Sequence, residues 1–226
     1  MPRASYQEQL EAMQEDVLYM SEVVVDRLRM ALEAMEQKDR EAARDVIHGD
    51  DEINDLYLDL EQDCIDLLAL QQPVAGDLRL IASSFKIITD LERIGDLAVN
   101  LGDYTLEAEH DMFPEVDINA IGDYTVEMVE DAMRAYEHQD ADACYRLAER
   151  DEELDDRCEQ ASQSVVRELI EIELEPEYDE AHVEALMQDV SRMLLTVRDL
   201  ERVGDHAVNI AARTLYMVEN DEELIY

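Results

Sequence analysis

The stretch Asp90–Leu101 reads DLERIGDLAVNL, and Asp199–Ile210 repeats it as DLERVGDHAVNI. Nine of the twelve positions are identical, and two of the other three exchange one aliphatic residue for another. Self-similarity at a long, fixed offset is the signature of duplicated structural units. The motif therefore predicts a chain built from one unit used twice.

The duplication extends beyond this motif. Residues 39–55 align without a gap with residues 140–156, at an offset of 101 residues, whereas the two motifs are 109 residues apart. The second unit therefore contains an eight-residue insertion, which we expect in the polar stretch Ile172–Glu184. These offsets divide the chain into two domains of ordinary size, residues 1–113 and 114–226.

Both units are expected to be helical, because the 226 residues include only 6 Gly and 4 Pro and show no alternating strand pattern. Asp39 and Asp140 occupy equivalent positions at which each is suited to cap a helix N-terminus. The expected helices span residues 5–37, 40–71 and 74–110 in the first unit, and 117–138, 141–172 and 178–219 in the second.

The last helix of each unit carries apolar residues at alternating three- and four-residue steps. This spacing is typical of helices that pack nearly parallel in a bundle. The predicted fold is therefore all-α, with two tandem repeated three-helix bundles. The apolar residues are Ile87, Leu91, Ile94, Ala98 and Leu101 in the first unit, and Val197, Leu200, Val203, Ala207 and Ile210 in the second.

The composition is strongly acidic: 59 Asp and Glu face 18 Lys and Arg, a net charge of −41, and only Lys38 and Lys86 are lysines. An acidic, lysine-poor surface is typical of proteins adapted to a saline cytoplasm, where ions screen the repulsion between charges. Nucleic-acid binding is excluded as a function, because phosphate contacts require clustered Lys and Arg.

The sequence shows neither a signal peptide nor an apolar run of the roughly 20 residues that a membrane span requires. The three cysteines, Cys64, Cys144 and Cys158, form no CxxC motif, and their odd number does not favour a disulfide framework. We therefore expect a cytoplasmic protein with buried or half-buried thiols.

Each copy of the motif places two carboxylates four residues apart, Glu92 with Asp96 and Glu201 with Asp205. This spacing puts both acids on one side of a helix and destabilises it by roughly 0.2–0.5 kcal/mol. We expect the two acidic stripes, continued by Asn100 and Asn209, to face away from the interhelical seam. The glycine between the acids, Gly95 or Gly204, indicates that another group lies close to the helix backbone.

A bound cation would offset the repulsion, and hard oxygen ligands suit Mg, Ca, Mn or iron. The preceding helix of each unit offers further donors four residues apart. They are Asp50 and Asn54 in the first unit and Asp151 and Asp155 in the second, with Asp51/Asp55 and Glu152/Asp156 as competing neighbours.

The two motifs, together with GDDEIN at Gly49–Asn54 and LLALQQPVAGDLRLIASSFKI at Leu67–Ile87, resemble the PhoU family over essentially the whole chain. The resemblance implies two repeated three-helix bundles, and iron or zinc clusters on ExxxD motifs that match Glu92/Asp96 and Glu201/Asp205. It also favours Asp50/Asn54 and Asp151/Asp155 over their neighbours as additional ligands.

The resemblance implies a negative regulator of high-affinity phosphate uptake and not an enzyme. The implied partner is the ATPase subunit of the phosphate ABC transporter and, in many bacteria, a membrane histidine kinase. The salt-adapted composition favours the transporter as the partner. We expect a homodimer that is peripheral to the membrane at most.

Two alternatives remain open on the sequence. A di-iron carboxylate enzyme uses Glu-x-x-His motifs from two helices, but only Glu107–His110 has this spacing here. His206 follows Asp205, yet its counterpart is Leu97, which excludes a duplicated histidine ligand. The other alternative is a metal-free helical adaptor.

Overall fold

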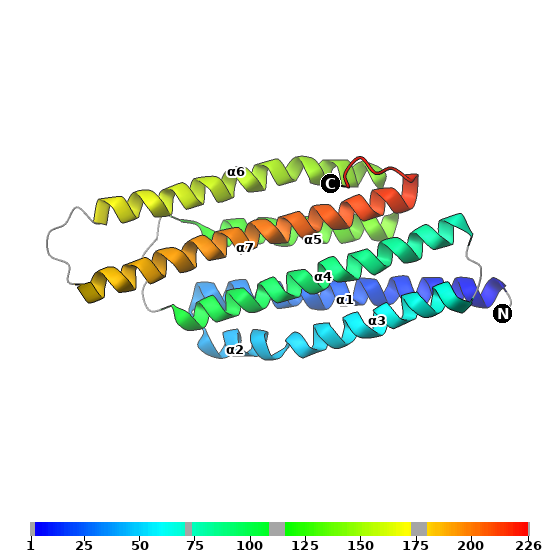
Figure 1. The fold of residues 1–226 in the computed structure, drawn as a ribbon, viewed down its shortest axis with the longest axis horizontal. Coiled ribbons are helices and arrows are strands. Elements are labelled where there is room, and N and C mark those ends of the chain that lie inside the picture. The colour runs from blue at the N-terminus through cyan, green and yellow to red at the C-terminus, as the bar shows by residue number, and fades with distance from the viewer. Residues whose placement is uncertain (1–2, 71–73, 109–115, 173–179, 226) are drawn as a thin grey trace.

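The computed structural model describes residues 3–70, 74–108, 116–172 and 180–225, and within them it contains seven α-helices and no strand (Figure 1). The predicted all-α fold is confirmed. The helices are α1 (Arg3–Gln37), α2 (Arg40–His48), α3 (Asp50–Leu70), α4 (Ala75–Glu107), α5 (Ile118–His138), α6 (Ala141–Ile172) and α7 (Glu180–Glu219).

The same turn precedes α2 and α6. Lys38 and Gln139 both adopt left-handed φ angles, of 55° and 54°. Oδ1 of Asp39 accepts hydrogen bonds from the backbone N–H groups of residues 41 and 42, at 2.9 and 3.1 Å. Oδ1 of Asp140 accepts one from Ala143 at 3.0 Å. Both predicted caps are confirmed, since each satisfies N–H groups that have no partner within the helix.

The predicted single helix over residues 40–71 is wrong, because the chain breaks it at Gly49 into α2 and α3. The guanidinium of Arg27, from α1, lies against the backbone at this point. A Cβ atom at residue 49 would lie 1.6 Å from Nη1 of Arg27. A side chain at residue 49 would therefore displace the guanidinium, and glycine leaves room for it.

The long helices α4 and α7 run antiparallel and side by side through the middle of the molecule (Figure 1). All ten seam residues predicted on these helices are buried, with at most 1% of their surface exposed. The two repeats meet along two pairs of helices, because α4 contacts α7 and α1 contacts α5. Within the repeats, α1 packs on α4 and α5 packs on α7. Helix α3 packs outside α4, and α6 outside α7.

Most of the buried apolar residues form one core that extends through both repeats, and a smaller core lies between α1, α3 and α4. The two bundles therefore share a core. The predicted boundary at residues 113/114 lies outside the described residues, as does most of the predicted insertion at 172–184. All three cysteines are buried and free. Within the described residues, no helix combines the length and the apolar character needed to cross a membrane.

Candidate functional site

The first carboxylate cluster consists of Asp50 and Asn54 on α3 and Glu92 and Asp96 on α4. Gly95 lets these helices approach closely, since a Cβ there would lie 3.0 Å from Cδ1 of Ile53 on α3. The amide of Asn54 donates a hydrogen bond to Oδ2 of Asp50 at 2.7 Å. The group that we expected to lie close to Gly95 is thus the side chain of Ile53 on α3.

The acids of this cluster are half-buried, which corrects the expectation that they face fully outward. Only 19% of the Glu92 side chain is exposed. Burial raises the pKa of Asp50 and of Glu92, and the charge of Asp96 raises both further. Arg93 partly neutralises the cluster, because its guanidinium lies 3.4 Å from Oε2 of Glu92 and 3.1 Å from Oδ2 of Asp96.

The second carboxylate cluster consists of Asp151 and Asp155 on α6 and Glu201 and Asp205 on α7. Burial raises the pKa of Asp151 to about 6, and the charges of the other three acids contribute. Oδ1 of Asp151 is buried and accepts no hydrogen bond. It lies 3.5 Å from the position that a Cβ at Gly204 would occupy. The second cluster therefore holds an unsatisfied oxygen close to the α7 backbone.

No cation pairs directly with the second cluster among the described residues: burial raises the pKa of Asp205, and the charges of His206 and Arg202 lower it without an ion pair. Arg202, the counterpart of Arg93, lies 3.6 Å from Oδ1 of Asp199. Among the described residues, no basic side chain forms an ion pair with Asp151, Asp155, Glu201 or Asp205. The repeats therefore bring together three carboxylates, an amide and an arginine in one case, and four unpaired carboxylates in the other.

The neighbouring acids that the sequence offered as alternative ligands are all exposed on α3 or α6 and do not belong to either cluster. They are Asp51, Asp55, Glu152 and Asp156.

The donor chemistry of both clusters fits a hard cation, since all the donors are oxygens. The unsatisfied Asp151 oxygen fits as well, because a cation would supply its missing partner. In the present side-chain positions, however, no three acidic, histidine or cysteine side chains of the described residues are arranged to share one ion. Ion binding would therefore require side-chain rotation within the clusters.

The motif makes a second set of contacts that the sequence did not reveal. Asp199 of α7 is fully buried, and its Oδ2 accepts hydrogen bonds from Asn100 at 3.1 Å and Tyr104 at 2.8 Å, both on α4. Reciprocally, Oδ1 of Asp90 lies within hydrogen-bonding distance of Asn209 (3.2 Å) and His206 (2.9 Å) on α7. Each copy of the motif thus binds the other.

These contacts correct the placement of Asn100 and Asn209 in the acidic stripes, because both amides point across to the other repeat. His206 likewise contacts Asp90. The only available sequence signal was that the first Asp and the Asn recur together, ten residues apart, in both copies.

The comparisons with known proteins agree with a chain built from two repeats. The family model of the PhoU domain matches the chain twice, over residues 17–105 and 118–214, once for each repeat. The chain belongs to the PhoU family. The two matches end before and begin after the segment in which the sequence placed the domain boundary.

Relatives in the PhoU family align over most of their length. A phosphate-specific transport system accessory protein PhoU homolog of Clostridium acetobutylicum is 32% identical over 223 residues, which cover 96% of each chain. The Escherichia coli phosphate-specific transport system accessory protein PhoU is 29% identical, over 95% of this chain and 85% of that one.

Solved structures show the same fold. The crystal structure of PhoU from Pseudomonas aeruginosa matches with a TM-score of 0.85 and 31% identity, covering 96% of this chain and all of that chain.

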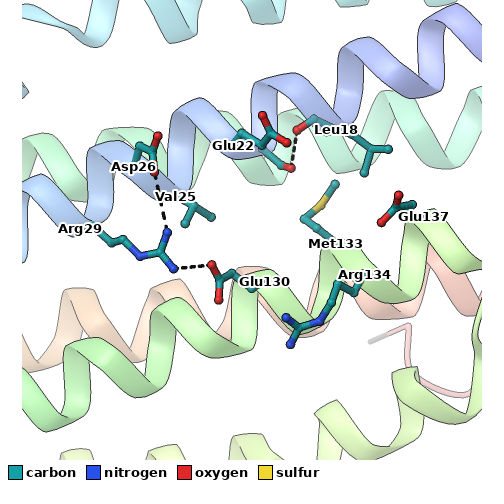
Figure 2. Close-up of a pocket in the computed structure, with 10 residues that line it drawn as sticks. Leu18, Glu22, Val25, Asp26, Arg29, Glu130, Met133, Arg134 and Glu137 are labelled. Atoms are coloured by element: carbon teal, nitrogen blue, oxygen red, sulfur yellow. Dashed lines mark hydrogen bonds and ion pairs between the residues drawn. The ribbon is translucent and has the colours of Figure 1, made fainter.

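A groove of about 390 Å³ lies between α1 and α5 and, unlike the carboxylate clusters, is lined by two arginines, Arg29 and Arg134 (Figure 2). Its floor includes the buried side chains of Val25 and Met133. Arg29 joins the two repeats there by pairing with Glu130, and it also lies 3.7 Å from Asp26 (Figure 2). Arg134 pairs with Asp131 on its own helix. A free anion such as phosphate would have to break these ion pairs to bind in the groove of this PhoU-family chain.

Proposed function

We propose that this protein is a negative regulator of high-affinity phosphate uptake, which limits import when phosphate is plentiful. The observation that carries the proposal is the double match to the PhoU domain, at equivalent positions of both repeats. The relatives named above are accessory proteins of phosphate-specific transport. The proposed role is regulatory rather than catalytic, as the names of these accessory proteins suggest.

The proposed partner is the ATPase subunit of the phosphate ABC transporter, and a phosphate-signalling kinase is the second candidate. Two equivalent repeats suit a partner that presents two copies of one surface. Regulation then requires that the protein bind one conformational state of the transporter more tightly than another, since only differential affinity shifts an equilibrium. The protein would act in the cytoplasm, as a homodimer.

We further propose that the two carboxylate clusters bind metal ions, with iron, zinc, Mg, Ca and Mn as candidates. Asp50, Asn54, Glu92 and Asp96 would hold one ion or a small cluster. Asp151, Asp155, Glu201 and Asp205 would hold the other. A bound cation would relieve the repulsion that raises the acids' pKa values and would connect α3 to α4 and α6 to α7.

Phosphate uptake by a deletion strain tests the regulatory proposal. Under phosphate-replete conditions, we expect the deletion strain to import labelled phosphate faster than the parent strain. Unchanged uptake would refute this role. A pull-down from native extract at physiological salt should recover the transporter ATPase.

Elemental analysis tests the metal proposal. Glu92→Gln with Asp96→Asn should remove metal from the first cluster only, and Glu201→Gln with Asp205→Asn from the second only. Unchanged metal content in both variants would refute these ligand assignments. Redox-active iron together with oxygen consumption would favour a di-iron enzyme, and metal-free protein would favour a simple adaptor.

A further inference from the structure

Large apolar side chains are exposed mainly on two helical hairpins. Of the eleven that are exposed among the described residues, nine lie on α3–α4 or α6–α7. These hairpins point to opposite ends of the molecule (Figure 1). The first tip comprises Leu58, Ile65, Leu68, Val74 and Leu78, and the second tip comprises Val166, Ile170, Val183 and Met187.

Several of these residues occupy equivalent positions in the two repeats. Ile65 corresponds to Val166 at the offset of 101 residues, and the two are 46% and 45% exposed. Leu78 corresponds to Met187 at the offset of 109 residues, and they are 46% and 49% exposed. Single exposed apolar residues need no explanation. Exposure of apolar side chains at equivalent positions in both repeats indicates an interaction surface.

The second tip is the more open of the two. At the first tip, Tyr6, Leu10 and Met13 of α1 bury the inner face of the hairpin in a small separate core. In the second repeat, α5 begins at Ile118, which corresponds to residue 17 of α1. No described helix therefore takes the place of the first turns of α1, and α6 and α7 extend beyond the end of α5 (Figure 1).

Both tips carry negative charge beside their apolar residues. Residues 58–78 include five acids with described side chains and no Lys or Arg, whereas the described side chains of the second tip, at 166–170 and 183–187, include Glu168, Glu184 and one Arg. Burial raises the pKa of Asp63 on α3, and the carboxylates of Asp16, Asp59 and Asp66 raise it further. Such surfaces repel anionic lipid and a second copy of a chain with a net charge of −41. The two tips are complementary to a partner surface on which apolar residues are flanked by Lys or Arg.

We propose that the two tips are docking surfaces for an amphipathic helix of a partner protein, with an aliphatic ridge flanked by Lys or Arg. An apolar helix face laid on an apolar surface is a recurrent mode of recognition, and flanking charges of opposite sign fix its orientation. The inference rests on the proposed function for the nature of the partner, a protein that presents the same segment twice.

Binding of a synthetic peptide to the full-length chain tests this inference. The probe is a fluorescently labelled 15-residue helix of Leu and Lys with all its Leu on one face. The control peptide has the same composition in shuffled order and no apolar face. Titration followed by anisotropy, in high-salt buffer that screens non-specific attraction, should show two sites per chain for the amphipathic peptide and much weaker binding of the shuffled one.

Surface variants assign the sites. Ile65→Ser with Leu78→Ser should weaken one site about tenfold, and Val166→Ser with Met187→Ser the other, because each pair removes apolar area from one tip. The matched control is Tyr19→Ser with Met30→Ser, which alters the two exposed apolar residues on α1. The control should bind the peptide as the unaltered chain does. All these side chains are exposed, so the thermal midpoint should change little.

Three outcomes would overturn the inference: equal binding of the shuffled peptide, equal loss in the α1 control, or dissociation of a dimer by the tip variants in sedimentation experiments. The last outcome would make the tips a self-association surface. Derepressed uptake in the deletion strain, together with a failed peptide experiment, would leave the proposed function standing and remove only this docking surface.

Discussion

The two repeats place an arginine at the same location but supply it from different helices. In the first repeat, Arg27 reaches from α1 to the carbonyl of Asp45 (3.1 Å) and to Glu52 (3.2 Å), across the gap that Gly49 leaves between α2 and α3. In the second repeat, the residue that corresponds to Gly49 is Arg150 on α6.

Arg150 reaches in the opposite direction, from α6 to α5, where it contacts Glu127 (3.1 Å), Asp131 and the hydroxyl of Tyr124 (3.3 Å). Helix α6 is therefore continuous where its counterpart is broken. The comparison teaches that both repeats place a positive charge at this junction, although the helix is broken in the first repeat and continuous in the second.

The two carboxylate clusters also differ in the arginine and the hydrogen-bond donor that accompany the acids. The first has an internal cation, Arg93, and an internal hydrogen-bond donor, Asn54. The second has neither, because Arg202 turns to Asp199 and an aspartate replaces the asparagine. The first cluster is thus partly neutralised by the protein itself, whereas the four carboxylates of the second have no ion-pair partner among the described residues.

The largest effect is expected at the contacts between the repeats. Asp199→Ala should lower the free energy of unfolding by about 2–4 kcal/mol, because it removes a fully buried carboxylate with partners on both α4 and α7. Asp90→Ala should cost only about 1 kcal/mol, since Asp90 is 15% exposed and accepts fewer hydrogen bonds. Denaturant unfolding of both variants measures the difference. Equal losses would show that the two contacts are equivalent despite their different burial.

The next effect concerns the affinity of each cluster for a cation. Mn²⁺ should bind the second cluster more tightly than the first. Asn54→Asp with Arg93→Ala, which gives the first cluster the charge of the second, should raise its Mn²⁺ affinity by about 2–3 kcal/mol, or roughly 30- to 150-fold. Titration followed by electron paramagnetic resonance measures both sites.

As a control, Asp155→Asn in the otherwise unaltered chain gives the second cluster the asparagine of the first and should lower the Mn²⁺ affinity of the second site. Two sites of equal affinity in the unaltered chain would contradict the comparison.

The pKa of Asp151 gives a smaller, pH-dependent effect in metal-free protein. The folded protein retains this proton up to about pH 6, whereas the unfolded chain releases it near the ordinary aspartate pKa of 3.8. Between these pH values the folded state binds more protons, so stability falls as the pH rises through this range.

Asp151→Asn should remove this loss. The variant should therefore equal the unaltered chain below about pH 4 and exceed it by about 1–2 kcal/mol above pH 6.5, a range reduced to allow for solvent screening of a half-buried group. Chemical denaturation in the presence of EDTA measures the difference. A constant difference between pH 4 and 7 would contradict the raised pKa.

The smallest expected difference is at the helix caps, where the repeats are most alike. Asp39→Ala and Asp140→Ala should each cost about 1 kcal/mol, because each leaves backbone N–H groups of α2 or α6 without a protein partner. Thermal unfolding of the two variants tests whether the caps are equivalent. A difference above about 1 kcal/mol would show that the ion pair of Asp140 with Arg146 contributes as well.

The sequence predicted features that depend on neighbouring residues. Asp39 and Asp140 could be recognised as caps because their partners lie two or three positions along the chain. The seam residues of α4 and α7 could be recognised because their spacing follows the helical period. The clusters could be assembled because the repeat relates α3 to α6 and α4 to α7.

The sequence did not predict features that depend on how α4 lies against α7. Asn100 fits an acidic stripe as well as it fits a contact with Asp199, and only the packing of the repeats distinguishes the two. The break at Gly49 lies against the guanidinium of Arg27, 22 residues earlier in the chain, and only the folded structure brings the two together. The shared core depends on the same long-range packing.

The reciprocal bonds between Asp90 and Asn209 and between Asp199 and Asn100 have a consequence for synthesis on the ribosome. The second motif follows the first by 109 residues, so the first repeat waits about 5–20 s for its partner at typical rates of translation. During that time Asp90, Asn100 and the buried side of α4 lack their α7 contacts. Because the motif is duplicated, the nascent first repeats of neighbouring chains on one messenger RNA carry matching Asp and Asn groups. An encounter between such chains would offer the Asn100 amide of one to the Asp90 carboxylate of the other, and α7 removes this alternative once Asn209 contacts Asp90.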